Sequence, residues 1–265
     1  MKLENNTILI TGGTSGIGLG LAQELFKKGN KIIILGRDIN KLEKIKNDFP
    51  DFLIYQADVS SPNTLKELKD WINKEVPELN VIINSAGIMK PHSLFDSTES
   101  IFDLIQDIQT NLIGTIAVDK ILLPQLLHKK EAMIVNISSG LANISSAAHP
   151  TYSASKAGVH MFTSALRDQL DYEGYSNVHV MELVPPLISE TNLESVRLEK
   201  TEGEAEDMKL IDLIHCTLEG MLNNEIRVNA GAAKALRKLG QTNPDEAERN
   251  FASKTIPTYF PEGLK

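Results

Sequence analysis

The chain has 265 residues, a formal net charge of −8 and a pI near 5.3. An acidic chain offers no basic stripe to neutralise phosphates, so we expect neither nucleic acid nor an anionic membrane surface as a partner. The single cysteine, Cys216, excludes an internal disulfide bond. No apolar run reaches the ~18 residues that a membrane helix needs, and no signal-peptide pattern precedes the first strand, so we expect a cytoplasmic protein.

Strand-like apolar runs alternate with helix-like periodic segments along the chain. The runs predict strands at 7–11, 31–36, 52–57, 81–83, 133–137, 178–184 and 225–228. The periodic segments predict helices at 16–28, 38–49, from 60 or 61 onward, 100–127, 151–172, 208–222, 231–239 and 244–252, followed by a loop that contains Pro257 and Pro261. Strands that are apolar throughout and separated by helices indicate a parallel sheet covered on both faces.

We therefore expect a single α/β domain over residues 1–265, a doubly wound Rossmann fold. Its parallel sheet would have six to seven strands with helices on both faces, and a helical tail would occupy residues 231–265. Ligands of such sheets bind at the carboxyl ends of the strands. Polar or glycine residues end several of the predicted strands, namely Gly12, Gly36-Arg37, Asp58, Asn84, Ser138-Ser139 and Pro185.

A glycine-rich turn follows the first predicted strand. It reads Thr11-Gly12-Gly13-Thr14-Ser15-Gly16-Ile17-Gly18 and leads into an apolar-periodic helix. Glycines let the backbone approach a ligand closely, and the first N–H groups of the helix carry partial positive charge, so this turn suits a phosphate or pyrophosphate. The alternative is a glycine-rich turn that binds nothing. We expect its ligand contacts to come from Gly12, Thr14, Ser15, Gly16, Ile17 and Gly18.

Tyr152 and Lys156 lie four residues apart on one predicted helix, so they share a face. The residues around them are small (alanine, serine and glycine), so a cofactor can lie against that face of the helix. A nearby lysine cation favours the phenolate, so we expect Lys156 to lower the pKa of Tyr152 from ~10 toward neutrality, which takes roughly 3–4 kcal/mol. The alternative is a core tyrosine beside a solvated lysine.

Five motifs together resemble the short-chain dehydrogenases/reductases, in particular their one-domain branch. They are Thr11-Gly12-x3-Gly16-x-Gly18, Asp58-Val59, Asn84-Ser85-Ala86-Gly87, Asn111, and Ser139 followed thirteen residues later by Tyr152-x3-Lys156. The stretch Glu182-Leu183-Val184-Pro185-Pro186 and the tail are similar to a bacterial subgroup often called DltE-like. The resemblance implies reversible hydride transfer between nicotinamide C4 and a small carbonyl or alcohol substrate.

The resemblance also implies the roles of the catalytic residues. Tyr152 would be the general acid or base, Ser139 would bind the substrate oxygen, and Lys156 would bind the nicotinamide ribose. Ser138 lies at the same strand end, but the spacing to Tyr152 favours Ser139. Asn111 would hold a water that links Lys156 to solvent. Without the resemblance, an asparagine at this position indicates equally a helix kink or a buried amide.

The end of the second strand predicts the cofactor. An acidic side chain there would bind a ribose 2′-hydroxyl, whereas Gly36 leaves space and Arg37 can pair with a 2′-phosphate. We therefore expect NADP in preference to NAD, with Asp38 as the residue that could turn inward and reverse this choice. By the same resemblance Asp58 and Val59 would contact adenine, and Asn84 would brace the central strands. Ala86 and Gly87 would complete this side of the cofactor site.

The segment after the sixth strand departs from the family pattern, because Pro186 stands where the family has glycine. Pro185 and Ile188 would still contact the cofactor, and either Ser189 or Thr191 would supply the hydroxyl. Residues 187–207 lie where the family has its substrate lid, and their acidic residues, Glu194 among them, indicate a solvated loop or a lid that disfavours anionic substrates. Three residues that flank the expected cleft, Met89, His92 and His149, lack metal-ligand spacing, so we expect no metal.

Two other functions fit parts of the pattern. A dinucleotide-binding sensor or scaffold would keep the fold without turnover, but it would not need all of Asn111, Ser139, Tyr152 and Lys156. A sugar-nucleotide epimerase also uses Tyr-x3-Lys, but with Gly-x2-Gly-x2-Gly spacing and a larger C-terminal domain. By analogy with the family, we expect a homodimer or homotetramer that pairs the helices carrying Asn111 and Tyr152.

Overall fold

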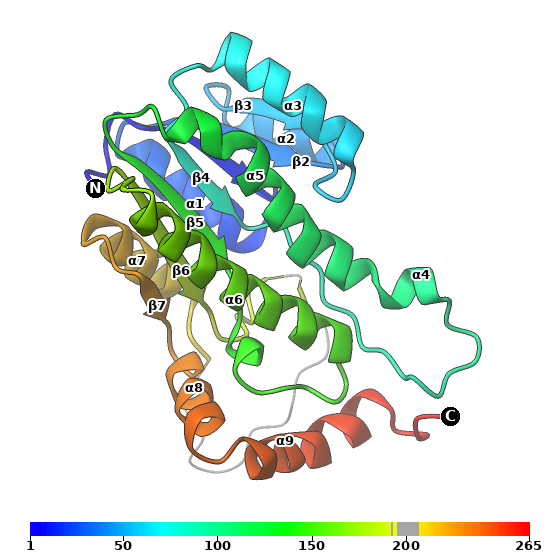
Figure 1. The fold of residues 1–265 in the computed structure, drawn as a ribbon. Coiled ribbons are helices and arrows are strands. Elements are labelled where there is room, and N and C mark those ends of the chain that lie inside the picture. The colour runs from blue at the N-terminus through cyan, green and yellow to red at the C-terminus, as the bar shows by residue number, and fades with distance from the viewer. Residues whose placement is uncertain (192, 195–206) are drawn as a thin grey trace.

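A computed structural model describes residues 1–191, 193–194 and 207–265. Within these residues, seven strands form one parallel sheet in the order β3-β2-β1-β4-β5-β6-β7 (Figure 1). The strands are β1 (Thr7–Thr11), β2 (Lys31–Gly36), β3 (Leu53–Gln56), β4 (Val81–Asn84), β5 (Ala132–Ile137), β6 (Val178–Val184) and β7 (Arg227–Asn229). The predicted doubly wound α/β fold is confirmed.

Helices cover both faces of this sheet. They are α1 (Gly16–Lys27), α2 (Ile39–Asp48), α3 (Pro62–Glu75), α4 (Ile101–Leu104), the π-helix η1 (Ile108–Ile113), α5 (Gly114–Leu126), the 3-10 turn η2 (Gly140–Ala142), α6 (Pro150–Tyr172), α7 (Leu210–Leu222), α8 (Ala233–Thr242) and α9 (Pro244–Tyr259). Proline begins α3, α6 and α9, where its missing N–H costs no helical hydrogen bond. No helix among the described residues is both long and apolar enough to span a membrane.

Alternate residues of each strand enter two separate cores. On β1, Ile8 and Ile10 pack in the core that α1, α2 and α7 cover, whereas Leu9 packs in the core under α3, α5 and α6. Figure 1 shows α5 and α6 in front of the sheet and α1 behind it. Because both faces are covered, the central strands carry no polar face, which explains their continuous apolar sequence.

The order of the strands reverses direction at β1. The chain first moves outward from β1 to β2 and β3, and then returns to place β4 on the other side of β1. Thr11 and Asn84 are register partners at the carboxyl ends of β1 and β4. The Thr11 hydroxyl accepts hydrogen bonds from the N–H groups of Ser85 and Ala86, both at 3.1 Å. This junction is where ligands of doubly wound sheets bind.

The helical region predicted over 100–127 is divided into three segments. The structure has a short α4, the π-helix η1 and then α5. Asn111 lies in η1, and its side-chain amide bonds to the backbone N–H and C=O of Ile88, both at 2.9 Å. The same amide donates a hydrogen bond of 3.0 Å to the Ser155 hydroxyl on α6, and π-helical turns are frequent at functional sites.

The loop predicted around Pro257 is wrong, because α9 continues through that residue to Tyr259. A proline in the last helical turn removes only one backbone hydrogen bond. Packing opposes that loss, since Thr255 is buried and the Tyr259 ring lies 4.5 Å from the His149 ring, centroid to centroid. Figure 1 shows α8 and α9 beyond the end of the sheet, near the start of α6.

Candidate active site

The glycine turn between β1 and α1 is closely packed. Gly12 has a φ of +64°, and a Cβ on it would lie 2.7 Å from the Cα of Ala86. A Cβ on Gly18 would lie 2.7 Å from the carbonyl oxygen of Gly12. Ser15 precedes α1, but its side chain makes no capping hydrogen bond in the described part of the chain. The first N–H groups of α1 therefore remain available to an anion.

Tyr152 and Lys156 lie one turn apart near the start of α6, and both are buried. Lys156 Nζ lies 5.8 Å from the centroid of the Tyr152 ring and donates a hydrogen bond of 2.8 Å to the Ile137 carbonyl at the end of β5. A Cβ on Gly87 would lie 3.5 Å from Asn111 Oδ1 and 3.6 Å from Lys156 Nζ. The ends of β4 and β5, η1 and α6 thus meet at one point.

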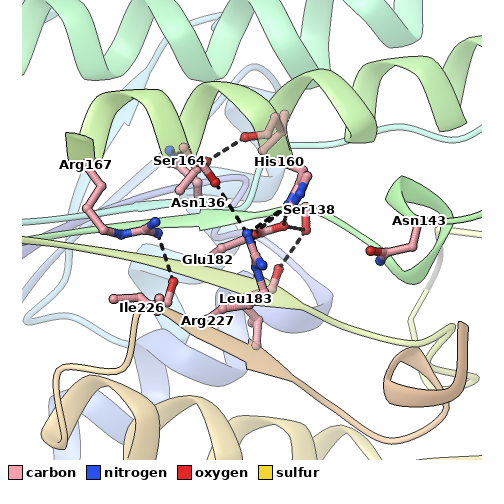
Figure 2. A network of polar contacts seen from close by, with 12 residues as sticks. Asn136, Ser138, Asn143, His160, Ser164, Arg167, Glu182, Leu183, Ile226 and Arg227 are labelled. Carbon is pink, nitrogen blue, oxygen red and sulfur yellow. Dashed lines mark hydrogen bonds and ion pairs between the residues drawn. The ribbon is translucent and has the colours of Figure 1, made fainter. Parts of the chain in front are cut away.

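The two serines after β5 have different surroundings. Ser138 Oγ donates a hydrogen bond of 2.6 Å to Glu182 on β6, and this carboxylate also contacts His160 and Arg227 (Figure 2). Ser139 instead begins η2 and forms a side-chain hydrogen bond with Tyr152. Ser138 therefore belongs to a structural network, whereas Ser139 lies beside the tyrosine.

The Glu182 network joins β6 and β7 to α6. Burial alone would raise the pKa of Glu182, but hydrogen bonds from His160, Ser138 and Arg227 outweigh it and bring the pKa to about 2. Arg227 Nε lies 2.6 Å from the carboxylate, and Figure 2 shows its guanidinium extending toward His160 and Ser164. The ionised carboxylate ties β6, β7 and α6 to the strand end that carries Ser139.

Burial opposes the lowering of the Tyr152 pKa that is expected from Lys156 together with an oxidised nicotinamide. Burial raises the pKa of Tyr152 to about 12, with the Ser139 hydrogen bond lowering it and the charge of Asp107 raising it. Burial also lowers the pKa of Lys156 to about 8. Sequence reasoning considered the lysine cation but not the cost of removing a phenolate from water, and here that cost dominates.

Comparison with known proteins identifies the family. A family model described as short chain dehydrogenase matches residues 6–202. The chain belongs to the short-chain dehydrogenase family. This short-chain dehydrogenase is 34% identical to the uncharacterized oxidoreductase DltE of Bacillus subtilis, over 92% of this chain and 96% of that one. It is 30% identical to the NADP-dependent 3-hydroxy acid dehydrogenase YdfG of Escherichia coli, over 75% of this chain and 79% of that one.

Solved structures agree in fold. A short-chain dehydrogenase of Burkholderia cenocepacia in complex with NADP is 18% identical, with a TM-score of 0.77 over 95% of this chain and 99% of that one. A ligand-free aldohexose dehydrogenase of Thermoplasma acidophilum is 27% identical, with a TM-score of 0.62 over 72% and 69%. The resemblance to short-chain dehydrogenases and to DltE is thus confirmed, and the family supports NAD(P)-dependent oxidoreduction.

The end of β2 has the arrangement that the sequence predicts. Gly36 is followed by the exposed Arg37. The Asp38 carboxylate caps α2, accepting hydrogen bonds from the N–H groups of Asn40 at 2.9 Å and Lys41 at 3.3 Å. Asp38 is therefore engaged by its own helix rather than turned toward the glycine turn.

The residues after β3 and β4 also have local partners. The Asp58 carboxylate accepts hydrogen bonds from the N–H and hydroxyl of Ser60, and Val59 is buried against Gly114. Asn84 Nδ2 donates to Asp119 at 2.6 Å and to Asn136 at 2.8 Å, so it joins β4 to β5 and α5. Burial raises the pKa of Asp119 to about 7, against the hydrogen bonds from these two amides.

The segment after β6 returns to the glycine turn. The Pro185 carbonyl accepts a hydrogen bond of 3.0 Å from Gly140 N–H, and Ile188 is buried in the core. The Thr191 side chain approaches the turn, because its Cγ2 would lie 3.3 Å from a Cβ on Gly16. Ser189 is exposed. The Thr191 hydroxyl itself donates a hydrogen bond of 2.9 Å to the Ile188 carbonyl, so the methyl group makes the approach to Gly16.

The predicted lid falls partly outside the described residues, which omit 192 and 195–206. Glu194 is described, and the expectation that it is a solvated charge is wrong. It is buried, with Oε2 at 2.9 Å from His149 Nε2 just before α6. A nearly apolar surrounding admits such a carboxylate only when it is paired. The sequence analysis did not identify this pair, nor the buried carboxylates of Asp107, Asp119 and Glu182. Asp119 and Glu182 could have been found, because each is a charged residue inside an apolar segment.

Proposed function

We propose that this protein is an NADP(H)-dependent oxidoreductase that interconverts a small carbonyl compound and its alcohol. The observation that carries the proposal is the meeting of Ser139, Tyr152 and Lys156 beside the glycine turn, at the carboxyl ends of the central strands. Oxidoreductases among its relatives support the reaction class. A screen of aldehydes and ketones that follows NADPH absorbance tests the proposal.

The residues of the crevice fit a dinucleotide. The close approach of Gly12 to Ala86 and the open N–H groups of α1 would hold the pyrophosphate, and a bound nicotinamide would supply the hydride. Arg37 would pair with the ribose 2′-phosphate. The full set that we propose for the cofactor is Gly12, Thr14, Ser15, Gly16, Ile17, Gly18, Arg37, Asp58, Val59, Asn84, Ala86, Gly87, Tyr152, Lys156, Pro185 and Ile188, with Thr191 beside the pyrophosphate.

Each of the proposed catalytic side chains has a separate role in proton transfer. Ser139 would hold the substrate oxygen, and Tyr152 would donate the proton to it during reduction. A pKa of about 12 keeps Tyr152 in the neutral form that donates. In oxidation the same hydroxyl would take the proton back from the substrate alcohol. Lys156 would bind the ribose hydroxyls, and Asn111 would fix the Gly87–Ile88 backbone beside it and hold the relay water.

Replacing Ser139 with alanine is expected to lower kcat/KM by about 100-fold or more, with little change in melting temperature, because the hydroxyl acts mainly in the transition state. Ser138→Ala is the matched control. It should keep kcat within about threefold but lose about 1–3 kcal/mol of stability, because Glu182 loses a buried donor. Initial rates and thermal unfolding measure both effects. The opposite pattern would assign the substrate contact to Ser138.

Replacing Arg37 with alanine is expected to raise the KM for NADPH about tenfold or more and to leave the KM for NADH unchanged. The physical reason is the loss of one charge-assisted contact with a phosphate that NADH lacks. Asp38→Ser is the control, because serine keeps a helix cap but removes the charge. A wild-type preference for NADH, or a gain in NADPH use by Asp38→Ser alone, would contradict the cofactor assignment.

The exposed apolar side chains support self-association. Ile101 and Phe102 on α4, Ile113 on η1 and Met161 on α6 are exposed by 49–74% of their surface. We propose that they are covered in a homodimer or homotetramer, as expected for the helices that carry Asn111 and Tyr152. Light scattering of the purified protein measures the assembly.

A further inference from the structure

Asp107 is a buried carboxylate next to the catalytic helix. It lies immediately before η1, and none of its side chain is exposed. Its Oδ2 accepts a hydrogen bond of 3.2 Å from the hydroxyl of Thr151, the residue before Tyr152. Its Oδ1 has no hydrogen-bond partner among the described residues. Burying this carboxylate without a full set of partners lowers the stability of the fold, and its contact, Thr151, lies one residue away from Tyr152.

His92 lies on the other side of Asp107 and is also buried. Its Nδ1 contacts the Glu99 carboxylate, and its Nε2 lies 3.9 Å from Asp107 Oδ2, which is too long for a hydrogen bond. His92 Nε2 also lacks a partner within the described residues. Two adjacent buried polar atoms without partners are rare in folded proteins and indicate a water or a functional group held at a cost in stability.

His92 connects Asp107 to a surface cavity. His92 and Glu99 line a cavity of about 930 Å³ that Lys90, Asp103 and the C-terminal Leu264 also line. Glu99 is partly exposed there, whereas Asp107 faces α6. The series Glu99–His92–Asp107 therefore runs from a cavity to the helix that carries Tyr152 and Lys156.

The charged groups around Asp107 determine which of its forms, neutral or ionised, is favoured. His92, Lys90 and Thr151 face Asp107 and favour its ionised form, whereas burial raises its pKa. The charge of Asp107 acts in turn on Tyr152 and Lys156, and it raises the pKa of both. Ser139 also contacts Tyr152. The buried His149–Glu194 pair lies at the start of the same helix, and the charge of His92 acts on His149.

We propose that Asp107 and His92 are positioning residues for the reaction: a buried carboxylate–imidazole pair, linked to solvent through Glu99, that places a negative charge against Thr151 at the start of α6, one residue before Tyr152 and five before Lys156. The proposal rests on the proposed function. His92 favours the ionised form of Asp107. The negative charge of Asp107 in turn favours the protonated forms of Tyr152 and Lys156. Neither residue touches the reacting atoms.

Asp107→Asn tests the proposal, because asparagine keeps the shape and can still accept from Thr151. Carbon-13 NMR of labelled lysine follows Lys156, whose signal is assigned by its loss in Lys156→Arg. The wild-type signal should titrate near pH 8, and Asp107→Asn should lower that midpoint by about one pH unit. A merely loosened site would do the opposite, because rehydration would raise the Lys156 pKa toward its ordinary value.

Turnover supplies the second readout. In Asp107→Asn the fall of NADPH-dependent reduction at high pH should begin about one pH unit lower, because Tyr152 loses its proton more readily. His92→Gln should shift both readouts in the same direction, and His179→Gln, a histidine near Glu131 at the opposite end of the sheet, should shift neither. A Lys156 midpoint that stays in place or rises in Asp107→Asn would overturn the inference. Because NMR needs no substrate, an inactive wild type would count against the proposed function alone.

Discussion

Replacing Tyr152 with phenylalanine is expected to lower kcat about 1,000-fold and to leave NADPH binding within about threefold of wild type. Only the hydroxyl that would transfer the proton is lost, and general acid catalysis contributes roughly 100- to 10,000-fold. The phenyl ring preserves the packing of a side chain that is 3% exposed and keeps its contact with Lys156. Initial rates of carbonyl reduction and calorimetric titration with NADPH measure the two effects separately.

Tyr175→Phe is the matched control for this substitution. Tyr175 follows α6 and is 36% exposed, so loss of its hydroxyl should change neither rate nor binding. Turnover retained by Tyr152→Phe would contradict the mechanism. Loss of NADPH binding in the same variant would show that the hydroxyl serves the cofactor site rather than proton transfer.

Replacing Gly12 with alanine is expected to weaken NADPH binding at least about 100-fold and to destabilise the fold. The left-handed backbone at Gly12, with φ +64°, costs a non-glycine residue roughly 1–2 kcal/mol. In addition, the new Cβ would lie 2.7 Å from backbone atoms of Ala86, which cannot move without displacing the loop after β4. That loop and the glycine turn form the proposed pyrophosphate site together.

Gly29→Ala separates backbone strain from loss of the site. Gly29 ends α1 with a φ of +82°, and a Cβ on it would meet nothing within 4 Å. It should lose about 1 kcal/mol of stability and bind NADPH as wild type does. Thermal unfolding and calorimetry provide both numbers. Equal binding by Gly12→Ala and Gly29→Ala would place the pyrophosphate elsewhere.

The parallel sheet and the strand ends at which a ligand was expected were within reach of the sequence because they depend on local patterns. Continuous apolar runs indicated a sheet covered on both faces, and the glycine spacing indicated a tight strand-to-helix turn. The π-helix at Asn111 was not predictable, because hydrophobic periodicity does not distinguish one widened turn from a regular helix. Within this π-helix, Asn111 forms hydrogen bonds with Ile88, which is 23 residues away in the sequence.

The electrostatics of the site were the least predictable part. Glu182 could be recognised as an unusual charge inside a buried strand, but its partners His160 and Arg227 lie on other elements. The pKa of Tyr152 depends on burial, the Ser139 hydrogen bond and the charge of Asp107, and only the fold reveals how completely the phenol is removed from water. The same holds for Asp107, whose role depends on its neighbours across the fold.

Deuterium transfer from the cofactor tests the central claim most directly. The protein is incubated with a carbonyl compound and NADPH deuterated at both C4 positions, and the alcohol product is examined by mass spectrometry and proton NMR. We predict a single deuterium on the carbinol carbon, formed by wild type and lost with Tyr152→Phe. An alcohol without deuterium, or no alcohol from any carbonyl tested despite tight NADPH binding, would contradict the account.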